Sequence, residues 1–223
     1  MERITESIFL RLSLGRLYDE ENKTDEALNA CNTILEQQPD QVNTLMLKAE
    51  LLQKKNDSAG SLAALEKAYQ LAPGNLEVSY KLAYQYAENK NAKVIPLADS
   101  LIAKDSLKLH GEPYYIKGLY FSNIDDKTKA LQLLNETTKR DYNYLNAYIE
   151  KSKILIGQKK INEALKTLQL ANTISPAFPD AYYWIGKCQE ELGQKEDAKL
   201  SYEKAYGLDK TFIEAKEAAD NIK

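Results

Sequence analysis

Small side chains recur along the chain at almost constant intervals, each set among larger apolar residues. They are Gly15, Ala49, Ala83, Gly118, Ser152 and Gly186. The steps between them are 34, 34, 35, 34 and 34 residues. A step of this size is the length of one helix–turn–helix unit. The pattern therefore predicts an all-α chain built from repeated pairs of antiparallel helices.

Further columns keep the same register. Twelve residues after the small residues lie Ala27, Ser61, Ile95, Ala130, Ala164 and Ala198. Seven residues later lie Ile34, Ala68, Ile102, Thr137, Ala171 and Ala205. Four residues before the small residues is a bulkier column, which includes Tyr114, Tyr148 and Tyr182 and is expected to be buried. Because two helices approach closely only where side chains are small, the columns predict helix–helix contacts.

Three repeats end with a proline, at Pro39, Pro73 and Pro176. The order of bulky, small, aromatic, alanine and proline positions resembles the tetratricopeptide repeat. That resemblance implies an α-α superhelix, a solenoid of antiparallel helix-turn-helix repeats, forming one domain over residues 1–223. The repeats are placed at about 8–41, 42–75, 76–110, 111–144, 145–178 and 179–212.

A capping helix over 211–222 is expected to close the C-terminal end. Thr211 would cap it, and Phe212, Ala215, Ala219 and Ile222 would form its apolar stripe. An amphipathic helix of this kind shields the last face of an open stack.

Repeat three departs from the pattern. Its second helix fits better with Val94, Ala98 and Leu101 facing inward, and Pro96 then falls in the first turn, where its missing N–H is tolerated. The following loop, Ser106 to Pro113, is longer than in the other repeats. The alternative pentatricopeptide repeat, which reads RNA, is disfavoured by the 34-residue step, the terminal prolines and the charge.

Composition is that of a folded chain, with 43% hydrophobic and 28% charged residues. The net charge of −3 argues against nucleic-acid partners, which require many phosphate-neutralising cations. Cys31 and Cys188 lie in repeats one and six, so both are expected to be small core residues without a disulfide.

Catalytic and metal-binding patterns are missing from the sequence. The single histidine, His110, lies in a loop without a cysteine nearby, and no nucleophile elbow, phosphate-binding glycine loop, CxxC or HExxH occurs. We therefore expect a non-enzymatic protein without a cofactor or a metal.

No run of 18 apolar residues predicts a membrane span, and Met1 to Ser7 do not form a signal peptide. We expect a cytoplasmic location by default. Because the chain starts almost on its first helix, the alternative is an envelope protein from which an upstream signal or lipid anchor has been removed. Abundant Lys, Asn, Ile and Tyr are typical of an AT-rich bacterial genome. At this end Ile4, Ile8 and Phe9 are expected to be partly exposed, which favours a partner, a missing segment or self-association there.

The resemblance also implies a concave groove, lined by the first helix of each repeat, that receives a protein or peptide segment. Carried onto this chain, the groove residues are Met46, Tyr80, Tyr84, Tyr115, Leu119, Ile149, Lys153, Tyr183 and Lys187. Tyrosine suits such a surface because it offers a large contact area with few rotors to freeze. The alternative is that the aromatic residues are core and the two lysines are simply solvated.

A chaperone-tail clamp of lysine, asparagine and arginine is disfavoured, because no set of three successive repeats matches it. The sequence thus predicts a protein-interaction scaffold that binds a partner in its groove. Two alternatives remain: a component of an assembly, for instance in the cell envelope, that uses its convex face or N-terminal end, or a regulatory domain of a larger signalling protein.

Overall fold

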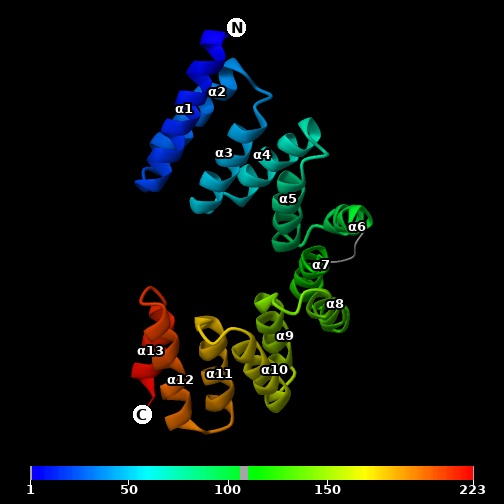
Figure 1. The fold of residues 1–223 in the computed structure, drawn as a ribbon, viewed down its shortest axis with the longest axis vertical. Helices are drawn as coiled ribbons and strands as arrows, with labels where there is room; N and C mark the ends of the chain where they lie inside the picture. Colours follow the sequence, from blue (N-terminus) through cyan, green and yellow to red (C-terminus); the bar gives the residue numbers. More distant parts are fainter. Residues whose placement is uncertain (1, 106–109, 223) are drawn as a thin grey trace. The chain divides into compact units, whose positions relative to one another are not determined.

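The computed structural model describes residues 2–105 and 110–222, with side chains from Leu10 onward. Over these residues every regular element is an α-helix (Figure 1). Contacts between Cα atoms divide the chain into two compact units, Met1–Leu101 and Ile102–Lys223. The predicted all-α class is confirmed, and so is the solenoid of antiparallel helix-turn-helix repeats. The single continuous domain stays a prediction.

The N-terminal unit is a row of helical hairpins. Within it α1 packs against α2 and α3 against α4, and successive hairpins meet where α2 contacts α3 and α4 contacts α5. Its helices are α1 (Glu2–Glu20), α2 (Thr24–Gln37), α3 (Val42–Lys54), α4 (Ser58–Leu71), α5 (Leu76–Glu88) and α6 (Val94–Lys104), the last of which runs past the end of the unit.

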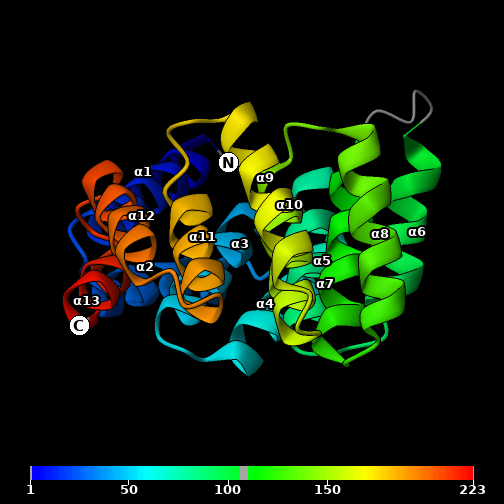
Figure 2. The ribbon, with the colours of Figure 1, turned by 90° about the horizontal axis from the view of Figure 1, so that it is seen from below.

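The C-terminal unit repeats this arrangement. The hairpins are α7 with α8, α9 with α10 and α11 with α12, and Figure 2 shows α13 lying beside α12, which it contacts. The helices are α7 (Glu112–Asn123), α8 (Lys127–Arg140), α9 (Leu145–Gly157), α10 (Ile161–Ile174), α11 (Pro179–Glu191), α12 (Lys195–Leu208) and α13 (Ile213–Asn221). In both units we call the first helix of each hairpin, and α13, an A helix, and the second a B helix.

The columns of small residues lie where the sequence placed them, at helix–helix contacts. All six residues from Gly15 to Gly186 are buried. The other two columns are buried except at Ile95 and Ile102, both in repeat three. There Val94, Ala98 and Leu101 are buried instead, which confirms the predicted shift by one residue, and Pro96 lies in the first turn of α6.

The bulky column is only partly buried. Tyr148 is buried and donates its hydroxyl to the carbonyl of Tyr142. Tyr114 and Tyr182 are half-buried, which corrects the expectation for them. The reason is that a long cation covers each ring: the guanidinium of Arg140 lies 4.3 Å from the Tyr114 centroid, and the ammonium of Lys204 lies 4.3 Å from that of Tyr182.

The turn inside every repeat contains one residue with a left-handed backbone. These residues are Asn22, Asn56, Lys90, Asp125, Lys159 and Gly193, with φ between 56° and 74°. At Asn56, its own N–H donates to the carbonyl of Gln53 and the N–H of Asp57 donates to that of Leu52. This is the Schellman pattern, which satisfies carbonyls at a helix end and favours glycine. Five of the six turns lack that glycine.

Replacing Lys90 by glycine is therefore expected to stabilise the protein by about 1 kcal/mol, since a left-handed backbone is strained for a residue with a Cβ. Thermal melting measured by circular dichroism should show a midpoint higher by a few degrees. The matched control is the equivalent turn of repeat six, where Gly193→Ala should lower the midpoint by a similar amount. An unchanged midpoint in both variants would contradict the strain argument.

The C-terminal cap forms as α13, with Ala215 and Ala219 buried against the unit and Phe212 half-buried at its N-cap position. Thr211 does not cap this helix, which corrects the prediction. Its hydroxyl and backbone N–H both donate to the Asp209 carboxylate, at 2.7 and 2.8 Å. These bonds lower the pKa of Asp209.

At the N-terminal end, the side chains of Ile4, Ile8 and Phe9 lie outside the described residues. Further along α1, Leu10, Leu14 and Leu17 are exposed at helical spacing.

The predicted loop Ser106 to Pro113 lies partly outside the described residues, and Pro113 is in the first turn of α7. Across the described part of the chain, no helix has both the length and the apolar character needed to cross a bilayer.

Candidate functional site

The nine predicted groove residues all lie on A helices. Met46 is on α3, Tyr80 and Tyr84 are on α5, and the remaining six lie on α7, α9 and α11 of the C-terminal unit. They fall into two columns one helical turn apart, and the two columns differ in how deeply they are buried.

In the first column, Met46, Tyr115 and Ile149 are buried, with exposed fractions of 6%, 7% and 5%. This contradicts the expectation that they lie open in a groove. Met46 packs with Leu45, Ala68 and Val78, and Tyr115 lies 4.8 Å from the ring of Tyr144. The cause is that successive A helices touch each other, as α7 does α9, so these three residues lie in the seam between them. Burial also raises the pKa of Tyr115.

The second column is more open, and in the N-terminal unit it borders a pocket of about 390 Å³ between α3 and α5. Glu50 and Tyr84 line this pocket. Its floor is made of Ala49, Ser61 and Leu65, which are buried. Two of the floor residues are small because Ala49 and Ser61 belong to the columns that let α3 and α4 approach.

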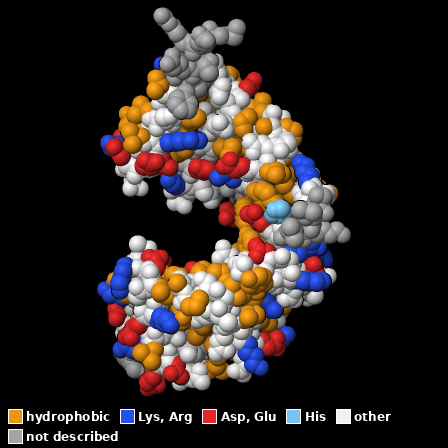
Figure 3. Space-filling view, in the orientation of Figure 1, with side chains coloured by type: hydrophobic (Ala, Val, Ile, Leu, Met, Phe, Trp, Pro, Cys, Tyr) orange, Lys and Arg blue, Asp and Glu red, His pale blue; other side chains and the backbone are white. Residues whose placement is uncertain are grey.

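Polar contacts between A helices surround the mouth of this pocket. Lys81 lies 2.6 Å from Glu50, and the Gln85 amide donates to Gln53 at 3.1 Å. Lys54 pairs with Asp19 of α1. Figure 3 shows side chains of both charges next to one another over the N-terminal unit. The mouth therefore holds α3 and α5 together around an apolar interior.

In the C-terminal unit, Lys153 and Lys187 pack on aromatic rings rather than standing free in solvent. The Lys153 ammonium lies 5.2 Å from the ring of Trp184 and 2.6 Å from Glu150. That of Lys187 lies 5.4 Å from the Tyr183 ring and 3.6 Å from Glu190. A pocket of about 480 Å³ beside them is lined by Ile156, Trp184, Lys187, Glu190 and Glu191.

Tyr183 and Leu119 differ in what surrounds them. Tyr183 belongs to an aromatic cluster with Tyr202 and Phe212, at centroid distances of 5.5 and 5.0 Å, so it helps to hold α13. Leu119 is half-buried on α7. The role of Tyr202 in this cluster was not predicted from the sequence. A signal was available, because the equivalent position is Leu134 in repeat four and Leu168 in repeat five.

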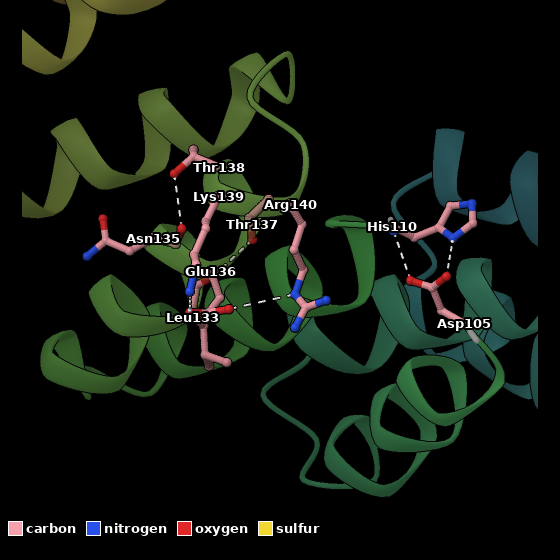
Figure 4. A network of polar contacts seen from close by, with 9 residues as sticks. All are labelled: Asp105, His110, Leu133, Asn135, Glu136, Thr137, Thr138, Lys139 and Arg140. Carbon is pink, nitrogen blue, oxygen red and sulfur yellow. Dashed lines mark hydrogen bonds and ion pairs between the residues drawn. The ribbon is translucent and has the colours of Figure 1, made fainter. Parts of the chain in front are cut away.

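The histidine and the cysteines are accounted for by local contacts. His110 is exposed, with its Nδ1 atom 3.0 Å from Asp105, whose carboxylate also accepts the His110 backbone N–H (Figure 4). Cys31 and Cys188 are free and buried, as predicted, and burial raises the pKa of each thiol to about 11. Among the described residues, no cluster of His, Cys, Asp and Glu could hold a metal ion.

Comparison with known proteins gives a consistent picture. Two sequence models of the tetratricopeptide repeat match the chain, one at residues 12–91 and one at 179–212. A DnaJ homolog subfamily C member 7 homolog from Dictyostelium discoideum is 28% identical over 137 residues, which are 59% of this chain. The match spans only 25% of that protein's length.

Two solved structures have the same fold. A tetratricopeptide repeat protein from Parabacteroides merdae superposes with a TM-score of 0.80 at 16% identity, covering 96% of this chain and 83% of that one. YrrB, described as a TPR protein with an unusual peptide-binding site, gives a TM-score of 0.52 at 19% identity, covering 86% and 98%.

Proposed function

Because this chain belongs to the tetratricopeptide-repeat family, we propose that it is a protein-interaction scaffold whose A helices bind a segment of a partner protein. The observation that carries this proposal is the pocket between α3 and α5, where Glu50 and Tyr84 border a largely apolar floor. A small apolar cavity with a few polar groups at its rim is the usual form of a binding site.

The pocket is suited to one large apolar side chain of the partner, since its floor is Ala49, Ser61 and Leu65. Tyr84 and Tyr80 are both half-buried on α5 and add aromatic contact area beside it. The amides of Gln53 and Gln85 lie at the rim, where they can exchange hydrogen bonds with a partner's backbone. Of the predicted groove residues, Met46 does not contact the partner and instead packs α3 against its neighbouring helices.

The C-terminal unit offers a second contact region on its own A helices. There Trp184, with Lys153 and Lys187 beside it, borders the other pocket, and the two ammonium groups can turn to a partner's carboxylates. Leu119 and Tyr183 add half-buried apolar surface, while Tyr115 and Ile149 support the helices from within. The peptide-binding site of YrrB, which has the same fold, supports the same mode of action here.

The experiment is a selection of random linear peptides displayed on phage against the whole chain, followed by affinity measurements on the selected peptides. Peptides that bind should carry at least one large apolar residue. Failure to select any peptide that binds in solution would argue against the proposal.

Tyr84→Ala is expected to weaken binding of the selected peptides at least about tenfold, because an aromatic residue at the centre of an interface typically contributes most of its energy. Fluorescence anisotropy of a labelled peptide measures this directly. The matched control is Tyr142→Ala, which removes an exposed tyrosine of the C-terminal unit and should leave affinity unchanged. Both variants should melt within a few degrees of the parent. Equal affinities for the two variants would place the peptide elsewhere.

A further inference from the structure

A second hollow lies on the other side of the N-terminal unit, between the B helices α2 and α4. Its volume is about 560 Å³. The walls come from α2 and α4, and the base comes from α3, which lies between them in the chain. We call this hollow the B-helix furrow. It shares no lining residue with the pocket between α3 and α5.

Four leucines supply the apolar surface of the base and the α2 wall, where Asn32 and Lys48 are the polar residues. The leucines are Leu28, Leu35, Leu45 and Leu52, of which only Leu45 is fully buried. The α4 wall is lined by Gly60, Ala63 and Ala64, whose small side chains keep the hollow open. Half-buried leucines facing small residues across a hollow form a groove that can accept apolar side chains.

The charge of the furrow is positive. Lys48 donates to the neutral amide oxygen of Asn32 at 2.8 Å, and Lys67 lies on the α4 wall. Neither lysine has an acidic partner within ion-pair distance among the described side chains. The one acidic residue in the lining, Asp57, accepts the backbone N–H of Gly60 at 2.9 Å as the N-cap of α4. The furrow therefore presents two lysines without acidic partners and one carboxylate that is engaged as a helix cap.

We propose that the B-helix furrow is a second docking surface, and that its occupant is an acidic amphipathic helix of a partner protein. The apolar face of such a helix would lie on the leucines, and its flanking carboxylates would pair with Lys48 and Lys67. This occupant follows from charge complementarity, which selects partners by suppressing those of like charge. The pocket between α3 and α5, in contrast, has its lysines paired with Glu50 and Asp19.

The probe for this proposal is a labelled helical peptide of about sixteen residues with leucine at positions i, i+4, i+7 and i+11 and glutamate at the flanking positions. Its matched partner carries lysine in place of every glutamate. The acidic peptide should bind the whole chain at least tenfold more tightly than the basic one by fluorescence anisotropy, and its affinity should fall as salt is raised.

Two variants locate the binding. The double variant Lys48→Glu with Lys67→Glu reverses both charges and should lower the affinity for the acidic peptide at least tenfold. Ala63→Trp fills the hollow from an exposed position and should lower this affinity by a similar factor. The control Lys199→Glu reverses one charge at an exposed position of α12 and should have no effect. All variants should retain the parent's melting midpoint to within a few degrees.

Tyr84→Ala separates this inference from the proposed function, since it should leave the acidic peptide's affinity unchanged. Loss of that affinity in Tyr84→Ala would move the peptide to the A helices and overturn the furrow proposal while supporting the proposed function. Equal binding of the acidic and basic peptides, or unaltered binding to the charge-reversed variant, would also overturn it.

Discussion

Replacing Gly186 by alanine is expected to destabilise the protein by about 3 kcal/mol. A Cβ atom at this position would lie 2.5 to 2.9 Å from ring carbons of Tyr202, which is closer than any stable contact. The Tyr202 ring cannot easily move away, because it is fully buried and its hydroxyl donates to Glu190. The new methyl group must therefore push α11 and α12 apart.

Urea unfolding followed by far-UV circular dichroism measures this effect as a lower midpoint. Gly15→Ala is the matched control, at the same place in repeat one. There the nearest atoms to an added Cβ are 3.6 Å away, an ordinary van der Waals distance. Because alanine is also the better helix former, this variant should be neutral or more stable by up to about 1 kcal/mol. Equal destabilisation of both variants would show that the clash is not the cause.

A second substitution tests the pairing itself. In repeats four and five the residue that faces the small position is Leu134 or Leu168, and Leu134 lies 3.2 Å from a Cβ built at Gly118. Tyr202→Leu should therefore relieve the clash, so that the double variant is more stable than the sum of the single changes by about 2 kcal/mol. Strict additivity would mean that Tyr202 and Gly186 do not compensate each other in size.

The helix–helix contacts could be predicted from sequence because each one demands a small side chain at a fixed place. Gly186, Ser152 and Gly118 hold the same structural position, and their common step exposes it. The shift in repeat three could be predicted for the same reason, since Val94, Ala98 and Leu101 offered the better apolar face. Period and side-chain size together are sufficient for this part of the fold.

The open surface was harder to predict, because one helical turn separates buried from accessible positions on an A helix. Met46 and Glu50 are four residues apart, yet the first is buried in the seam between helices and the second borders the pocket. Which face of α3 stays open depends on how closely neighbouring A helices approach, and that distance is set by side chains on other repeats. A single column of residues does not contain this information.

The left-handed turn residues show a signal that sequence reasoning missed. They recur at the same step as the small column, but only Gly193 is a glycine, and Lys90 and Lys159 are not residues that usually indicate such a turn. The backbone bonds of the helix end hold these residues in place in spite of their side chains. A search by period alone would have found the column.

Tyr115 gives the sharpest test of the distinction between packing and binding, and Tyr115→Ala is expected to cost about 4 kcal/mol. The ring is buried and packs against Tyr144, so its removal leaves a cavity inside the C-terminal unit. The thermal melting midpoint should fall by about 8–16 °C, at about 2–4 °C for each kcal/mol in a chain of this size. Tyr115→Phe keeps the ring and should retain most of the stability.

The comparison with Tyr84→Ala then separates the two roles. Tyr84 borders the pocket, so its loss should reduce peptide affinity while the melting midpoint changes little. Tyr115→Ala should do the reverse: below its lowered midpoint, the folded variant should still bind peptides selected on the parent, because the ring lies in the seam and not at the pocket. A Tyr115→Ala variant that melts like the parent but no longer binds would return this residue to the open face of the groove, where the sequence first placed it.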